Sequence, residues 1–180
     1  MLYGKENNVA VKPIITYPDP LLERISEPVG DNLEGIAELV RDMTDTMYAA
    51  TGADLAAVQI GVHKRLFIIE AMAAGGEAKD PPMVFIDPEV IELSPEKEVA
   101  EEGCLSFPGI YLPVKRSLRA KTRARNLRGE TFEVEGEGLF ARAMQHEAEH
   151  LDGLLFIRFV GRLKRQMVKR RLAREAAENG

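Results

Sequence analysis

The chain has 180 residues, of which 45% are hydrophobic and 29% are charged, a composition typical of a folded globular protein. At this length we expect a single domain over residues 1–180, with a substantial hydrophobic core. The net charge of −5 argues against a general nucleic-acid-binding protein, which would normally be basic, so we expect no DNA partner.

The cysteine content and the apolar runs indicate the cellular compartment. The chain has one cysteine, which cannot form an intrachain disulfide and fits a reducing environment. No stretch approaches the roughly eighteen apolar residues of a membrane span, and residues 1–8 are polar, without a signal-peptide core. We therefore expect a soluble cytoplasmic protein with no membrane partner.

The first part of the chain predicts an extended segment and then a long helix. Residues 11–20 contain three prolines, which resist helix, and residues 21–25 predict a short helical turn. A helix is predicted next, with Asp31 as its N-cap and its end near Gly52. Its apolar face consists of Leu33, Ile36, Ala37, Val40, Met43 and Met47. We expect this helix to pack and to have no chemical role.

Residues 52–59 are rich in small side chains and have two readings. They could border a peptide groove, because small residues let another backbone approach closely. They could also be an ordinary loop that enters a buried strand. Residues 65–70 then predict a buried strand, residues 71–82 a surface loop, and residues 83–93 two short strand pieces around Pro88.

The lone cysteine, Cys104, lies in the stretch Glu102-Gly103-Cys104-Leu105-Ser106. A free cysteine is commonly a small buried hydrophobic residue. A metal site with two histidines, however, needs a third protein ligand, and a thiolate is a strong candidate for it.

Residues 117–125 alternate strictly, with Arg119, Lys121, Arg123 and Arg125 on one face, which predicts a half-exposed strand. The basic face could suggest nucleic acid, but a solvated sheet face is the favoured reading. Phe132 and Val134 continue the pattern on a returning strand.

Residues 145–150, Gln145-His146-Glu147-Ala148-Glu149-His150, contain two of the three histidines. If residues 143–151 are helical, His146 and His150 share one face and can hold one divalent metal ion. The adjacent Glu147 is then placed to take up and return a proton. The alternative is an ordinary packed or solvated helix face. Asp152-Gly153 predicts the end of this helix.

Residues 161–179 predict a C-terminal helix, with Leu163, Met167, Val168 and Leu172 on one side. Its many lysines and arginines make it locally basic in an acidic protein. It is either a solvated surface helix or a docking element for an acidic or RNA-rich partner.

Three stretches, in order, resemble the motifs of the peptide deformylase family. The family motifs Gly-x-Gly-Leu-Ala-Ala-x-Gln, Glu-Gly-Cys-Leu-Ser and Gln-His-Glu-x-Asp-His correspond to residues 52–59, 102–106 and 145–150. Tyr17-Pro18-Asp19-Pro20 and Gln59-Ile60-Gly61 also look like the family, so the resemblance covers nearly the whole chain. It implies an α+β fold with antiparallel strands packed around a central metal-binding helix, and a C-terminal helix. It also implies removal of the N-formyl group from the initiator methionine of nascent polypeptides.

The resemblance assigns roles to individual residues. It implies that Cys104, His146 and His150 are the metal ligands, with a fourth position for water, and that Glu147 is the general base. The Gln59 side chain and the Leu105 N–H would donate to the oxyanion. The substrate-binding positions would be Gly52, Ala53, Asp54 and Gly103, with the peptide added as a strand against Ala53 and Gly103. Glu102 and Arg116 would orient the ligands. Iron(II) is the implied native ion, and zinc, nickel and cobalt also suit this donor set.

The chain departs from the family pattern at two positions. Asp54 stands where the family has its second glycine, so we expect weaker handling of ordinary formyl-methionyl peptides or an altered preference at the first side chain. Glu149 stands where the family has aspartate. That position is not a ligand, so we expect metal binding to survive while a contact around the ligands shifts.

Two other functions compete with deformylation. A metal-dependent peptidase would usually take its third ligand from a downstream histidine or glutamate, whereas the third histidine here, His63, lies far upstream. The other alternative is a deformylase-like protein of weak or no standard activity that acts as a binding module. Whether the protein is a binding module or an enzyme, its basic C-terminal helix is a candidate for contact with the ribosome.

Overall fold

The structure is a computed structural model that describes residues 10–180, so the polar opening at residues 1–8 lies outside it. The helices are α1 (Ile36–Ala49), α2 (Leu139–Leu151) and α3 (Arg162–Glu178), with short 3-10 helices η1 (Pro20–Glu23), η2 (Ala57–Ile60) and η3 (Phe156–Phe159). The strands are β1 (Asp54–Ala56), β2 (Leu66–Ile69), β3 (Met83–Leu93), β4 (Lys97–Gly103), β5 (Tyr111–Ser117), β6 (Arg119–Arg125) and β7 (Thr131–Glu137). Within the described residues, each helix is too short or too polar to cross a membrane.

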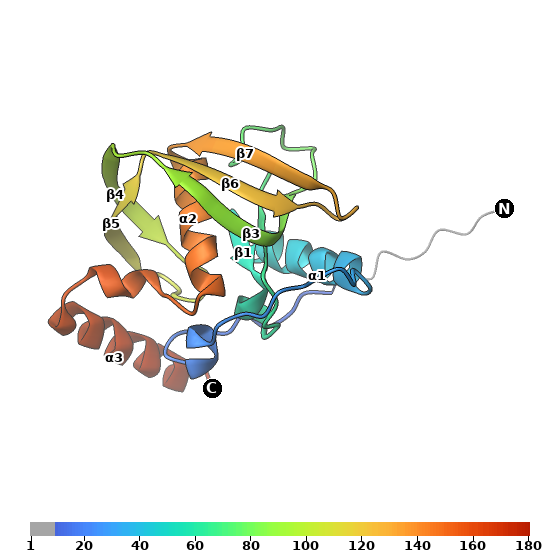
Figure 1. The fold of residues 1–180 in the computed structure, drawn as a ribbon. Coiled ribbons are helices and arrows are strands. Elements are labelled where there is room, and N and C mark those ends of the chain that lie inside the picture. Colours follow the sequence, from blue (N-terminus) through green and yellow to red (C-terminus); the bar gives the residue numbers. More distant parts are fainter. Residues whose placement is uncertain (1–9) are drawn as a thin grey trace.

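The strands form two antiparallel sheets around α2 (Figure 1). The larger sheet has the order β1-β2-β3-β6-β7, and β4 pairs with β5 in a separate hairpin. Helix α2 contacts all strands of the larger sheet and also β5. This arrangement confirms the predicted α+β fold, with antiparallel strands around a central helix and a C-terminal helix.

Strand β2 is buried on both faces because a helix covers each of them. Phe67 and Ile69 point toward α2 and join Phe85 in one core cluster. Leu66 and Ile68 point to the opposite side, where they pack with α1. A strand covered on both faces carries apolar residues without alternation, which is why residues 66–69 form a continuous hydrophobic run.

A third core cluster attaches α3 to the hairpin and to the end of α2. Its members come from the loop before β5, from β5, from η3 and from α3, and they include Phe107, Leu112, Val114, Phe156, Val168 and Leu172. The rings of Phe107 and Phe156 meet edge to face, with centroids 4.9 Å apart. The C-terminal helix is therefore anchored by this cluster beside the hairpin.

Several elements agree with the sequence patterns. The short turn at η1, the buried strand β2 and the returning strand β7 form as predicted, and Asp152 caps the end of α2. The basic face of β6 is a solvated sheet face, because Lys121 and Arg123 both pair with Glu133 on β7. The alternative interpretation, that this face binds nucleic acid, is therefore not supported.

Other predictions were wrong in detail. Helix α1 begins at Ile36, after Gly35 with a φ of 75°, and not after Asp31. The preceding turn is bound to the sheet instead, since Asp87 accepts a hydrogen bond from the Val29 N–H. Strand β3 is continuous rather than two pieces, although its pairing with β6 shifts register between Ile86 and Glu89.

Two further differences concern the hairpin and α3. The β4–β5 hairpin had no counterpart among the predicted elements. Of the four apolar residues expected on one face of α3, Val168 and Leu172 are buried, but Leu163 and Met167 are 73% and 62% exposed. The helix contacts the core through a narrow stripe.

This stripe gives a stability test with a matched control in the same helix. Leu172→Ala should lower the free energy of unfolding by about 2–4 kcal/mol, because a buried side chain leaves a cavity. Leu163→Ala removes the same atoms from an exposed position and should change it by less than about 0.5 kcal/mol. Denaturant unfolding followed by circular dichroism measures both. Equal losses in the two variants would contradict the observed packing of α3.

Candidate metal centre

Helix α2 places the two histidine side chains on successive turns of one buried face. The Nε2 atoms of His146 and His150 are 3.1 Å apart, and their rings meet edge to face. The opposite side of the helix packs into the core through Ala141, Met144 and Leu151, which are buried. The two imidazole nitrogens therefore point to one location.

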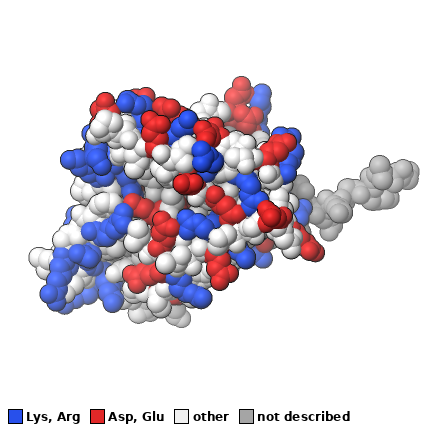
Figure 2. All heavy atoms as spheres, viewed as in Figure 1, with Lys and Arg blue, Asp and Glu red and all other residues white. Residues whose placement is uncertain are grey.

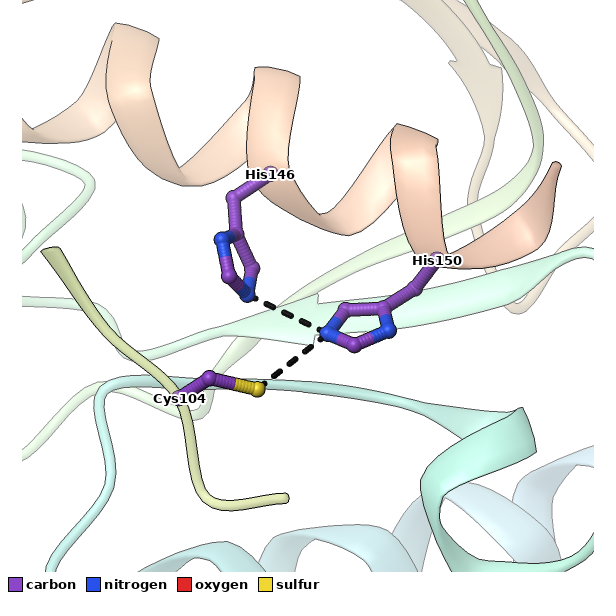
Figure 3. Close-up of side chains that lie close together, drawn as sticks. All are labelled: Cys104, His146 and His150. Carbon is purple, nitrogen blue, oxygen red and sulfur yellow. Dashed lines mark hydrogen bonds between the residues drawn. The ribbon is translucent and has the colours of Figure 1, made fainter. Parts of the chain in front are cut away.

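Cys104 reaches the same location from the end of β4 (Figure 3). Its Sγ is 3.3 Å from the Nε2 of His150, and the three potential ligand atoms all lie within 4.8 Å of one another. Burial lowers the pKa of His150 well below its usual value, and the nearby His146 acts in the same direction, so this ring is held in the neutral form that binds metal. One sulfur and two imidazole nitrogens at these distances fit a divalent transition metal.

Glu102 orients the ring of His146 from behind. Its Oε1 faces the Nδ1 of His146, which leaves Nε2 directed at the cysteine. Burial alone would lower the pKa of His146, but hydrogen bonds with Cys104 and Glu102 outweigh it and raise the pKa well above its usual value. A carboxylate behind a ligating histidine fixes the orientation of the ring.

The Glu102 carboxylate is itself bound by two arginines. Arg116 on β5 donates to both carboxylate oxygens, at 3.0 and 2.7 Å, and Arg142 on α2 donates at 3.0 Å. Burial opposes ionisation of Glu102, yet the hydrogen bonds from His146 and Arg116 hold its pKa well below the usual range. The residue is therefore an anion under ordinary conditions.

Glu149 extends this network toward the surface. Its Oε1 accepts hydrogen bonds from Arg116 at 2.6 Å and from Arg158 at 2.5 Å. Both guanidinium groups also lie over the ring of Phe159, 5.0 and 4.7 Å from its centroid. Glu149 is thus a partner of Arg116 and lies outside the three-donor cluster, which leaves the histidines and cysteine in place.

Glu147 lies inside the site, with its carboxyl only 1% exposed and its Oε1 3.9 Å from the Nε2 of His146. Burial and the nearby Asp54 raise the pKa of Glu147 well above its usual value. Burial also raises the pKa of Asp54, which lines the cavity in front of the histidines. Two acidic groups therefore face each other beside the histidines.

Gln59, in η2, directs its side-chain amide toward the cysteine. Its Oε1 accepts a hydrogen bond from the Ala56 N–H at 2.9 Å, which fixes the orientation of the amide. Its Nε2 is then a donor aimed into the site, 3.1 Å from the Oγ of Ser106 and 3.5 Å from the Sγ of Cys104.

A cavity of about 780 Å³ opens in front of these groups. The residues expected to bind substrate all line it, together with Cys104, Leu105 and His146: these are Gly52, Ala53, Asp54 and Gly103. A Cβ atom on Gly52 would come within 2.6 Å of the Leu105 side chain, so the glycine lets Leu105 sit at the cavity wall. The four predicted substrate-binding residues and two of the three predicted ligands, Cys104 and His146, thus line one cavity.

Some residues near the site were missed, and one histidine lies outside it. Arg142, the second arginine on Glu102, had one available signal: it is a charged residue in an apolar helical stretch, one turn before His146. Gln145 ties α2 to β5 by exchanging hydrogen bonds with the Ser117 backbone. His63 contacts the Leu21 carbonyl instead of the cluster, which removes it as a metal ligand.

Comparisons with known proteins agree with this geometry. Residues 11–166 match the family model described as polypeptide deformylase. The peptide deformylase of Acinetobacter baumannii (strain SDF) is 45% identical over 164 residues, covering 91% of each chain. That of Rhizobium meliloti (strain 1021) is 44% identical over 172 residues, covering 96% of this chain and 98% of the relative.

Solved structures show the same likeness in three dimensions. A peptide deformylase from Legionella pneumophila has a TM-score of 0.86 and 38% identity, covering 94% of this chain and 98% of that one. The Ehrlichia chaffeensis enzyme in complex with actinonin has a TM-score of 0.85 and 34% identity, covering 92% and 98%. The chain therefore belongs to the polypeptide deformylase family, metal-dependent hydrolases that remove the formyl group from new polypeptides.

Proposed function

We propose that Cys104, His146 and His150 bind the divalent metal with which this chain deformylates nascent peptides, and that iron(II) is the native ion. The observation that carries the proposal is the convergence of these three donors, within 4.8 Å, next to the buried carboxyl of Glu147. When bound, the metal supplies Lewis acidity, which polarises a carbonyl group and makes water acidic enough to ionise near neutral pH. Zinc(II), nickel(II) and cobalt(II) are the other ions that this donor set accepts.

The surrounding side chains have separate roles in the reaction. Glu147 takes a proton from the attacking water and later gives a proton to the departing amine nitrogen, as a general base and then an acid. The Gln59 Nε2 and the Leu105 N–H donate hydrogen bonds to the oxygen that becomes negative in the tetrahedral state. Losing one such donor typically lowers turnover about a hundredfold or more.

The peptide part of the substrate fits between two sheet edges. Strand β1 is the edge of the larger sheet, and β4 belongs to the hairpin on the other side of the cavity. We propose that the peptide adds as a strand against Ala53 and Gly103, which line this cavity with little side-chain bulk.

Formate release is the decisive measurement. Wild-type protein loaded with iron(II) under anaerobic conditions should release formate from formyl-Met-Ala-Ser. Cys104→Ser should keep its circular dichroism spectrum but bind metal more weakly. Loss of a hydrogen-bond partner behind a ligand lowers metal affinity roughly 10–100-fold, and loss of this ligand should lower it further. Metal analysis of both proteins supplies the control. Metal-loaded wild type that releases no formate from any formylated peptide would favour a binding module instead.

Asp54 provides a second test, because it adds a second carboxyl group near Glu147 at the wall of the substrate cavity. Asp54→Gly should raise kcat/KM for formyl-Met-Ala-Ser by roughly tenfold, which corresponds to about 1.4 kcal/mol. Asp54→Asn keeps the size without the charge and separates the two effects. Equal kcat/KM values for wild type and Asp54→Gly would contradict the prediction that Asp54 weakens turnover of formyl-methionyl peptides.

We further propose that the outward face of α3 contacts the ribosome. The helix carries seven basic and two acidic side chains, and blue side chains gather over it in Figure 2. Its basic residues lie on two sides of the buried stripe formed by Val168 and Leu172. Arg162, Arg165 and Lys169 share the side suited to an RNA-rich surface.

Charge reversal tests this docking better than deletion, since deletion would also remove Val168 and Leu172 from the core. Arg162→Glu combined with Lys169→Glu should lower co-sedimentation with ribosomes roughly tenfold or more at low salt. Lys97→Glu combined with Lys115→Glu, on exposed positions of the hairpin, makes the same change in net charge and should have little effect. A similar loss in both double variants would point to net charge alone.

A further inference from the structure

A second groove lies beside the substrate cavity, between the start of β5 and α3. It has a volume of about 830 Å³ and shares Gly109, Ile110 and Tyr111 with the cavity in front of the histidines. Its remaining lining residues come from β5 and α3, and they are Leu112, Lys164, Met167, Val168, Arg170, Arg171 and Arg174. The two hollows are therefore neighbours separated by the 109–111 segment.

The ring of Tyr111 connects the two hollows. Tyr111 pairs with Gly103 across the hairpin, and a Cβ atom on Gly103 would come within 2.8 Å of that ring. The ring therefore lies directly on the position against which the substrate strand is proposed to pair. Tyr111 lines both hollows, so a peptide bound at Gly103 lies next to the entrance of the second groove.

The groove has an apolar floor and a basic rim. Ile110, Leu112 and Val168 are buried beneath it, while Tyr111 and Met167 are 66% and 62% exposed. Exposed large apolar side chains gathered at one hollow are typical of a binding surface. None of the described residues that line the groove is acidic.

Two of the four cations are available for a ligand. Arg171 pairs with Glu175 at 2.8 Å, and Arg174 lies 3.8 Å from Glu178. Lys164 and Arg170 form no ion pair with another residue in the described part of the chain. Both line the groove, whereas Arg162 and Lys169 do not, so the groove is distinct from the proposed ribosome-facing surface.

We propose that this groove binds the downstream segment of the formylated peptide and favours segments that carry acidic side chains. The proposal rests on the proposed deformylase function and adds a region of contact beyond the residues that reach the metal centre. Two observations indicate that the occupant is a peptide segment. The groove is continuous with the substrate cavity, and its basic rim is complementary in charge to acidic side chains. Five of the lining residues lie beyond the family match at residues 11–166, and they are Met167, Val168, Arg170, Arg171 and Arg174.

Peptides of two lengths test the groove. Formyl-Met-Ala-Ser serves as the short substrate, and two longer peptides extend it to about eight residues, enough to pass Tyr111 at roughly 3.3 Å per residue. One extension contains leucine and glutamate, and the other contains leucine and lysine. The acidic peptide should show about tenfold higher kcat/KM than the basic one, through KM and not kcat, and added salt should reduce the difference.

Matched variants of α3 provide the control. Lys164→Glu combined with Arg170→Glu should abolish or reverse the preference for the acidic peptide. Arg162→Glu combined with Lys169→Glu makes the same change in net charge at positions that do not line the groove and should preserve the preference. Equal kcat/KM for the acidic and basic peptides in wild type, or an equal loss in both double variants, would overturn the proposal.

A binding measurement separates failure of this inference from failure of the proposed function. Fluorescence anisotropy of the labelled acidic peptide without its formyl group reports on the groove whether or not formate is released. Binding that depends on Lys164 and Arg170 supports the groove even in a protein that releases no formate. If a short RNA binds this face and the acidic peptide shows no advantage over the basic one, the groove is not a peptide site.

Discussion

The buried carboxylate of Glu102 is the interaction on which the site depends. It faces the His146 ring and receives hydrogen bonds from Arg116 and Arg142, so it joins β4, β5 and α2 at one point. A buried ion is costly unless it is fully hydrogen-bonded, and removing one partner leaves an uncompensated charge. The hairpin whose connecting segment begins with Cys104 is therefore bound to the helix that carries the histidines.

This network explains how distant parts of the chain form the candidate metal centre. The cysteine comes from the end of a hairpin strand, the histidines from the central helix, and the amide of Gln59 from a 3-10 helix at the edge of the other sheet. Each of these side chains is held by a partner, such as the Ala56 N–H for Gln59. Donors that are already oriented need little reorganisation when charge develops during the reaction.

The two departures from the family motifs have different surroundings. Glu149 is longer than aspartate, and its carboxylate meets two arginines whose guanidinium groups lie on Phe159. Its charge is therefore compensated outside the three-donor cluster. Asp54 lines the substrate cavity and lies near another acid, Glu147. This second carboxyl group contributes to the raised pKa of the proposed general base.

The sequence alone determined the central helix with its histidine pair, the buried strand β2 and the alternating strands β6 and β7, because local periodicity encodes them. The family motifs also pointed to the cysteine and the two histidines that the structure brings together. Only the tertiary structure decided that α1 starts at Ile36, that Leu163 and Met167 remain exposed, and that Arg142 binds Glu102. These features depend on which surfaces meet across the fold, and contacts between residues far apart in the chain leave no periodic signal in the sequence.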